Sequence, residues 1–201
     1  MRVLRASGGL LVSDEVQPGL GRLGTHLWGH RLLGAAPDIA VLGKALGNGH
    51  PLAALVARPE PMAAFRERFG YFNTTAATPV AAAAGTAVLA AMERDGLVEH
   101  ARRTGHHIAQ ELAGMARPGV ARITAHGLMA AVELVDDAGA PDPARAEEVV
   151  ERMKDAGVLI GRIGAQMHVL KIRPPLPFAP EHADRLVTTL DGALAETRVP
   201  A

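Results

Sequence analysis

Two charged residues of opposite sign end two apolar segments in the first part of the chain. Asp14 follows the segment from Leu10 to Ser13, and Lys44 follows the segment from Ile39 to Gly43. Short apolar segments of this kind are typical of strands buried on both faces of a parallel sheet. Parallel strands bring their carboxyl ends to one edge, where open α/β sheets bind ligands. We therefore expect a buried carboxylate to face a buried amine at that edge.

This pair has two interpretations. The first is a structural ion pair between Asp14 and Lys44. The second is a carbonyl cofactor bound to Lys44 as a Schiff base, with Asp14 beneath a pyridine nitrogen. An amine attacks an aldehyde only when it is neutral, so such a site must lower the lysine pKa by burial. A carboxylate against the pyridine nitrogen keeps that nitrogen protonated, and the ring then accepts the electrons of a breaking C–H bond.

Longer motifs around these residues resemble one family, the class III pyridoxal-phosphate-dependent aminotransferases of fold type I. Within it, the closest resemblance is to the ethanolamine-phosphate phospho-lyase subgroup. The resemblance follows the order of the chain and rests on Asp14–Gln17 with Gly19–Gly24, on Leu42–Pro51, on Tyr71–Thr74 with Pro79, and on Ile172–Leu176.

The resemblance implies a role for each matching position. Lys44 would be the Schiff-base lysine and later the proton shuttle at the substrate's α carbon. Asp14 would pair with the pyridine nitrogen of pyridoxal 5'-phosphate. Val16 would pack on one ring face, and Gln17 would hydrogen-bond near the ring's phenolic oxygen. Thr74 would reach the cofactor phosphate of a neighbouring subunit, which implies a homodimer.

The chain departs from the family pattern at two sites. Glycines usually follow the threonine at position 74, whereas Thr75 and two alanines follow it here, so Thr75 is the alternative phosphate ligand. Most members carry a substrate-binding arginine where this chain has Lys171, and Arg173 lies two residues further on. Side chains two apart on a strand share a face, and two cations suit a doubly charged anion. The alternative is that both residues form a solvated strand end.

Similarity leaves two reactions open, both on a small amino compound. One is transamination, and the other is elimination of phosphate from an amino-alcohol phosphate such as phosphoethanolamine. The sequence begins just before the strand with Asp14, so we expect only the C-terminal half of the family fold. A truncated, catalytically incomplete fragment is therefore an alternative, and an interaction module that uses the C-terminal part is a third.

The expected fold is α/β. Residues 1–117 are predicted to form the C-terminal part of the cofactor-binding large domain, an incomplete and mostly parallel sheet with helices. Residues 118–201 are predicted to form a small α+β domain, because Pro118 and Gly119 break the pattern. The predicted strands are 10–16, 39–44, 52–57, 128–135, 158–160 and 168–172, and the predicted helices are 26–33, 61–68, 79–94, 97–115, 143–156 and 180–196.

Composition excludes several other classes. The 201 residues carry 21 basic and 21 acidic side chains and contain no cysteine. A balanced charge gives no electrostatic footprint for nucleic acid, and the absence of cysteine excludes disulfides and thiolate metal sites. The nine histidines lack the spacing of a zinc helix, so no metal site is predicted. No segment is typical of a signal peptide or a membrane span, and we expect a cytoplasmic protein.

Overall fold

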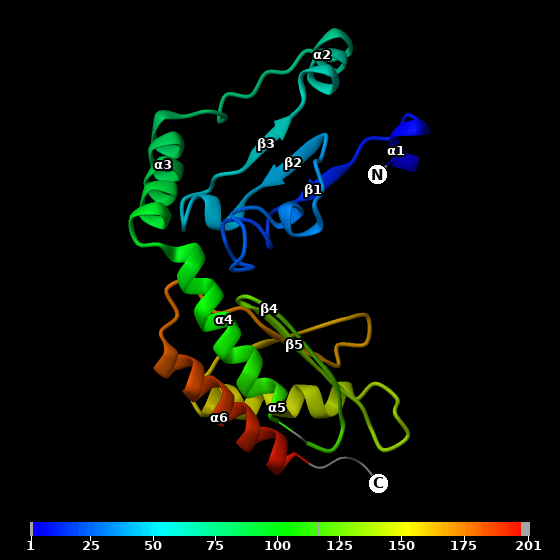
Figure 1. Ribbon diagram of the computed structural model, residues 1–201, viewed down its shortest axis with the longest axis vertical. Coiled ribbons are helices and arrows are strands. Elements are labelled where there is room, and N and C mark those ends of the chain that lie inside the picture. Colours follow the sequence, from blue (N-terminus) through cyan, green and yellow to red (C-terminus); the bar gives the residue numbers. More distant parts are fainter. Residues whose placement is uncertain (1, 116, 198–201) are drawn as a thin grey trace. The chain divides into compact units, whose positions relative to one another are not determined.

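The computed structural model describes residues 2–115 and 117–197 (Figure 1). The chain divides into two compact units, Met1–Val98 and Glu99–Ala201. The sequence-based prediction set the boundary between residues 117 and 118, after helix α4 (Leu97–Ala113). The two units separate near the start of that helix instead. The difference arises because the buried face of α4, which includes Ile108 and Leu112, belongs to the core of the second unit.

A small mixed sheet positions the residues of interest in the first unit. Strand β2 (Ile39–Leu42) lies between β1 (Val12–Asp14) and β3 (Ala54–Ala57). β1 and β2 run parallel, as predicted, and β3 returns antiparallel after a turn. The prediction that β1 and β2 are buried on both faces is wrong for this chain. Val12 is 54% exposed, so at least one face of β1 is not buried.

Helical segments precede, connect and follow the strands of this sheet along the chain. They are α1 (Arg2–Ala6), the 3₁₀ segments η1 (Gly29–Leu33) and η2 (Lys44–Leu46), α2 (Pro59–Arg68) and α3 (Pro79–Arg94). The predicted start of α3 is confirmed, because Thr78 Oγ1 accepts the N–H of Ala81 and Pro79 occupies the first turn. Small residues on α3 allow close packing. A Cβ on Gly85 would lie only 2.8 Å from Leu52 Cδ2.

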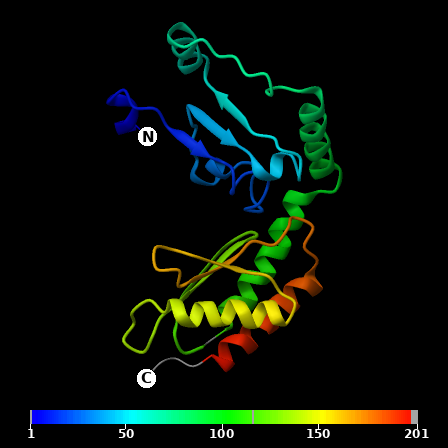
Figure 2. The ribbon, with the colours of Figure 1, turned by 180° about the vertical axis from the view of Figure 1, so that it is seen from behind.

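The second unit is an antiparallel sheet with one face covered by helices. The strand order is β4–β5–β7–β6, and Figure 2 shows α5 and α6 close together on this unit. Buried residues of both helices, of α4 and of one sheet face form a single core. The bounds are β4 Val120–His126, β5 Met129–Leu134, α5 Pro143–Asp155, β6 Gly161–Ile163, β7 Val169–Ile172 and α6 Pro180–Glu196.

Two strands of this sheet differ from the sequence-based prediction. β4 was not predicted, because a register shift between Val120 and Arg122 interrupts its alternation of apolar and polar residues. The strand expected at 158–160 is wrong. Val158 and Ile160 pack against the core, but ladder pairing begins at Gly161, opposite Lys171.

A buried arginine joins three separate segments of the second unit. Arg145 donates from Nε to Thr197 Oγ1 at 3.1 Å, from Nη1 to the Pro118 carbonyl at 2.8 Å and from Nη2 to the Leu194 carbonyl at 3.1 Å. Burial lowers the pKa of this guanidinium below its ordinary value. A charged group that is buried among oxygen acceptors stabilises the unit as long as all of its partners remain in place.

Candidate active site

The parallel pair of strands brings Asp14 and Lys44 to the same edge of the sheet. Asp14 is the last residue of β1 and pairs with Val41, and Lys44 begins η2 directly beyond the end of β2. Asp14 Oδ1 accepts the N–H of Val16 at 3.0 Å. Both side chains are exposed, so the predicted burial of the pair is wrong for this chain. Nothing in the described first unit covers this edge.

The backbone around Lys44 has an unusual conformation. Lys44 has a φ of 45°, in the left-handed region that residues with a Cβ rarely adopt. The preceding Gly43 is buried, and a Cβ placed on it would lie 3.7 Å from Val16 Cγ2. Val16 therefore lies beside the peptide that leads into Lys44. Strained backbone of this kind is characteristic of functional sites.

The other residues that the sequence predicts for the cofactor lie on exposed loops. Gln17 is exposed and follows Val16 directly. Thr74 and Thr75 are exposed in the segment between α2 and α3. Thr75 donates its N–H and its hydroxyl to Asn73 Oδ1, at 2.9 and 2.8 Å. Asn73 thus shapes the turn that presents both threonines.

The two predicted substrate cations lie at the end of β7, in the second unit. Lys171 is half-buried between Ala131 and Gly161 in the sheet register, and its side chain passes over Gly161, whose Cβ would lie 3.9 Å from Nζ. Arg173 follows the strand and donates Nη1 to the carbonyls of Ala130 and Ile172, both at 2.8 Å. Burial lowers the pKa of Arg173 below its ordinary value.

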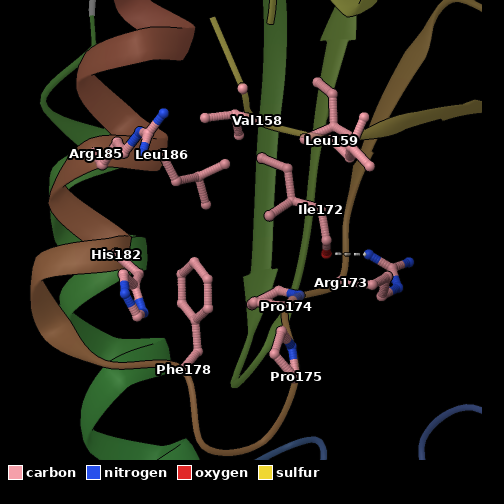
Figure 3. A pocket seen from close by; sticks show the side chains of 12 residues that line it. Val158, Leu159, Ile172, Arg173, Pro174, Pro175, Phe178, His182, Arg185 and Leu186 are labelled. Carbon is pink, nitrogen blue, oxygen red and sulfur yellow. Dashed lines mark hydrogen bonds between the residues drawn. The ribbon is translucent and has the colours of Figure 1, made fainter. Parts of the chain in front are cut away.

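A pocket of about 280 Å³ lies beside Arg173 within the second unit. Figure 3 shows Phe178, Ile172 and Leu186 around the pocket, while the Arg173 side chain points away from them. The full lining is Gly157, Val158, Leu159, Ile160, Ile172, Arg173, Pro174, Pro175, Phe178, His182, Arg185 and Leu186.

Sequence reasoning missed one buried acid at the first sheet edge. The Glu15 side chain is 0% exposed, and its carboxylate accepts hydrogen bonds from Ser13 Oγ and from the backbone N–H groups of Gly29 and His30. His30 Nδ1 also lies 2.8 Å from Glu15 Oε1. Burial raises the pKa of Glu15, but these hydrogen bonds outweigh it and leave the pKa below the ordinary 4.5.

Comparisons with known proteins identify the family of this chain. The family model described as aminotransferase class-III matches residues 3–194. The chain is 38% identical to alanine–glyoxylate aminotransferase 2 homolog 2, mitochondrial, of Arabidopsis thaliana, over 96% of this chain and 41% of that protein. It is 34% identical to ethanolamine-phosphate phospho-lyase homolog 1 of Caenorhabditis elegans, over 95% of this chain and 42% of that protein.

A solved structure supports the same assignment. The phospholyase from Arthrobacter in complex with phosphoethanolamine superimposes with a TM-score of 0.94 at 39% identity, over 98% of this chain and 48% of that one. The chain therefore belongs to the class III aminotransferase family. It spans about two fifths to one half of the length of these relatives. Family members depend in general on pyridoxal phosphate.

Proposed function

We propose that this chain contributes the lysine side of a pyridoxal 5'-phosphate site in an enzyme that acts on a small amino compound. The observation that carries this proposal is the parallel register of β1 and β2, which brings Asp14 and Lys44 to one edge, with Val16 beside the peptide that enters Lys44.

The residues at this edge fit such a cofactor. Lys44 would hold its aldehyde carbon, Asp14 its pyridine nitrogen, Val16 one ring face and Gln17 the region of its phenolic oxygen. Bound there, the cofactor would supply a ring that accepts the electron pair of a breaking C–H bond. The exposed turn with Thr74, or Thr75 in its place, would reach a phosphate across a homodimer interface.

Within this proposal, Lys44 has two tasks. Its amine binds the cofactor and then moves a proton at the substrate carbon that carries the amino group. Asp14 keeps the proton on the pyridine nitrogen through its negative charge, and its bond from the Val16 N–H holds the carboxylate in one direction. A general base of this kind works best when its pKa lies near the working pH. Lys44 is exposed in the part of the chain that the structure describes.

Among the open reactions, we favour phosphate elimination from an amino-alcohol phosphate. Lys171 occupies the position where most family members carry an arginine, and a lysine binds phosphate as a point charge. Arg173 adds a second positive charge, although its Nη1 is held by two backbone carbonyls. Transamination is the alternative, and the relatives include both kinds of enzyme.

Product analysis of the whole chain tests this preference. The chain is incubated with pyridoxal 5'-phosphate and either phosphoethanolamine or an amino donor with a keto acid, and inorganic phosphate and keto acid are measured. We expect phosphate release that is lost in Lys44→Ala. Formation of keto acid alone contradicts the lyase assignment. A folded chain that binds no cofactor and forms neither product supports the incomplete fragment, and a partner that binds Lys44→Ala unchanged supports an interaction module.

Sedimentation of the chain tests the homodimer separately, and a monomer in the presence of cofactor contradicts it.

The cellular compartment stays a prediction: we propose the cytoplasm, whereas the Arabidopsis relative is named mitochondrial. In the part of the chain that the structure describes, no helix combines the length and the apolar character that a membrane crossing requires.

A further inference from the structure

The buried carboxylate of Glu15 and the exposed carboxylate of Asp14 are neighbours in the chain. β1 ends at Asp14, and Val16 already belongs to the turn that follows it. Asp14 is exposed, whereas Glu15 is buried and accepts a hydrogen bond from Ser13 Oγ at 2.8 Å, so Ser13 and Glu15 lie on one side of the chain. Glu15 therefore lies behind the residues that would face the cofactor.

The Glu15 carboxylate holds the start of η1 against the end of β1. Oε2 accepts the N–H of Gly29 at 2.6 Å, and Oε1 accepts the N–H of His30 at 2.9 Å. Because an ionised carboxylate only accepts hydrogen bonds, the nearby His30 Nδ1 acts as a further donor. Glycine is required at position 29, where a Cβ would lie 2.7 Å from Pro18 Cβ and 3.2 Å from Glu15 Oε2.

The backbone of Glu15 is held as firmly as its side chain. Its N–H donates to the Val41 carbonyl at 2.9 Å, and its carbonyl accepts the N–H of Gly19 at 3.0 Å. With both peptide groups and the carboxylate bonded, the backbone on either side of Glu15 has little freedom to rotate. The directions of the Asp14 and Val16 side chains depend on that backbone.

We propose that Glu15 is a positioning residue that holds Asp14, Val16 and Gln17 in the arrangement that faces the cofactor. It touches neither cofactor nor substrate and acts through the strand end between β1 and the loop that leads to η1. The part of this inference that concerns the cofactor rests on the proposed function. The part that concerns the direction of Asp14 stands on the hydrogen bonds alone.

The variant Glu15→Gln tests the proposal with a minimal change of shape. A glutamine has one carbonyl oxygen and one NH₂ group, whereas donors lie against both oxygens of Glu15. Whichever way the amide turns, its NH₂ faces an N–H or O–H donor. Glu67→Gln makes the same chemical change at an exposed position of α2 and is the matched control.

Amide hydrogen exchange of the full chain, with no cofactor added, gives the first result. The N–H of Val16 donates to Asp14 Oδ1, so its exchange rate reports whether the Asp14 carboxylate stays in place. In Glu15→Gln we expect the amides of Val16, Gly29 and His30 to exchange about tenfold faster. The same amides are expected to be unchanged in Glu67→Gln. Faster exchange at Gly29 and His30 with an unchanged Val16 amide overturns the proposal, because Glu15 would then only anchor η1.

Ser13→Ala keeps the experiment decisive if Glu15→Gln does not fold. This variant removes one donor to Oε1, and we expect a smaller increase, about threefold, at the Val16 amide. An unchanged Val16 amide in a folded Ser13→Ala variant overturns the proposal.

Binding of pyridoxal 5'-phosphate separates this inference from the proposed function. If the unmodified chain binds the cofactor, we expect its Kd to rise about tenfold in Glu15→Gln and to stay constant in Glu67→Gln. An unchanged Kd contradicts the positioning role toward the cofactor. If the unmodified chain binds none, the proposed function of this chain fails, and the Val16 amide still decides whether Glu15 positions Asp14.

Discussion

The turn that follows Lys44 leaves no room for a side chain at Gly47. A Cβ on Gly47 would lie 2.0 Å from the carbonyl oxygen of His50 and 3.1 Å from Leu52 Cβ. The obstacle is backbone, so it cannot rotate away as a side chain would. To reach ordinary contact, the 47–50 segment must shift by roughly 1 Å.

We therefore expect Gly47→Ala to lower the free energy of unfolding of the first unit by about 3 kcal/mol, near the upper end for overpacked sites. Gly70→Ala is the control, because the described chain places no atom within 4 Å of a Cβ there. We expect that variant to change stability by less than about 1 kcal/mol.

Urea unfolding followed by tryptophan fluorescence measures this difference. The single tryptophan of the sequence, Trp28, is half-buried in the first unit, where a Cβ on Gly19 would lie 3.2 Å from its ring. Equal urea midpoints for Gly47→Ala and Gly70→Ala contradict this prediction, because they would mean that the 47–50 turn shifts without loss of stability.

Three further predictions concern stability. Gly105→Ala should lower the free energy of unfolding by about 3 kcal/mol, since its Cβ would lie 2.4 Å from the Gly127 backbone. The control Gly192→Ala, at an exposed position of α6, should raise the free energy of unfolding by about 0.5 kcal/mol. Equal stabilities of the two variants in calorimetry contradict this packing. Arg145→Met should cost about 3 kcal/mol, because three oxygen acceptors lose the hydrogen bonds that the guanidinium donates, and an unchanged calorimetric midpoint would show that these bonds add nothing. The pKa of Glu15 is lowered in the folded chain, so its contribution to stability is complete above pH 4.5 and is lost as the pH falls through the folded pKa. The difference in urea midpoint between the unmodified chain and Glu15→Gln should shrink below pH 4.5, and a constant difference argues against an ionised Glu15.

The sequence was sufficient to predict the elements that carry the candidate site. Asp14 ends β1 and Lys44 follows the end of the parallel strand β2, as their apolar segments indicate, and the predicted cap at Thr78 forms. Their burial was not predictable, because it depends on what covers the sheet edge. β4 was not predicted because a bulge near Val120 disturbs the alternation of apolar and polar residues along this strand.

Glu15 shows why the rest of the site could not be predicted. Beside Asp14 it is one more acid of a motif, and its partners Gly29 and His30 are distant in the sequence. The available signal was the position of Glu15 next to Asp14, because neighbouring side chains of an extended segment point in opposite directions. Only the folded structure shows that Gly29 and His30 lie against the Glu15 carboxylate.

The proposed function requires the Lys44 amine to bond covalently to the aldehyde of pyridoxal 5'-phosphate. The most direct measurement is borohydride reduction of the chain after incubation with the cofactor, followed by peptide mass spectrometry. We expect a stable cofactor adduct on the peptide that contains Lys44, absent from Lys44→Ala and reduced in Asp14→Asn. An adduct spread over Lys154 and Lys171, or none on a folded chain, would contradict it.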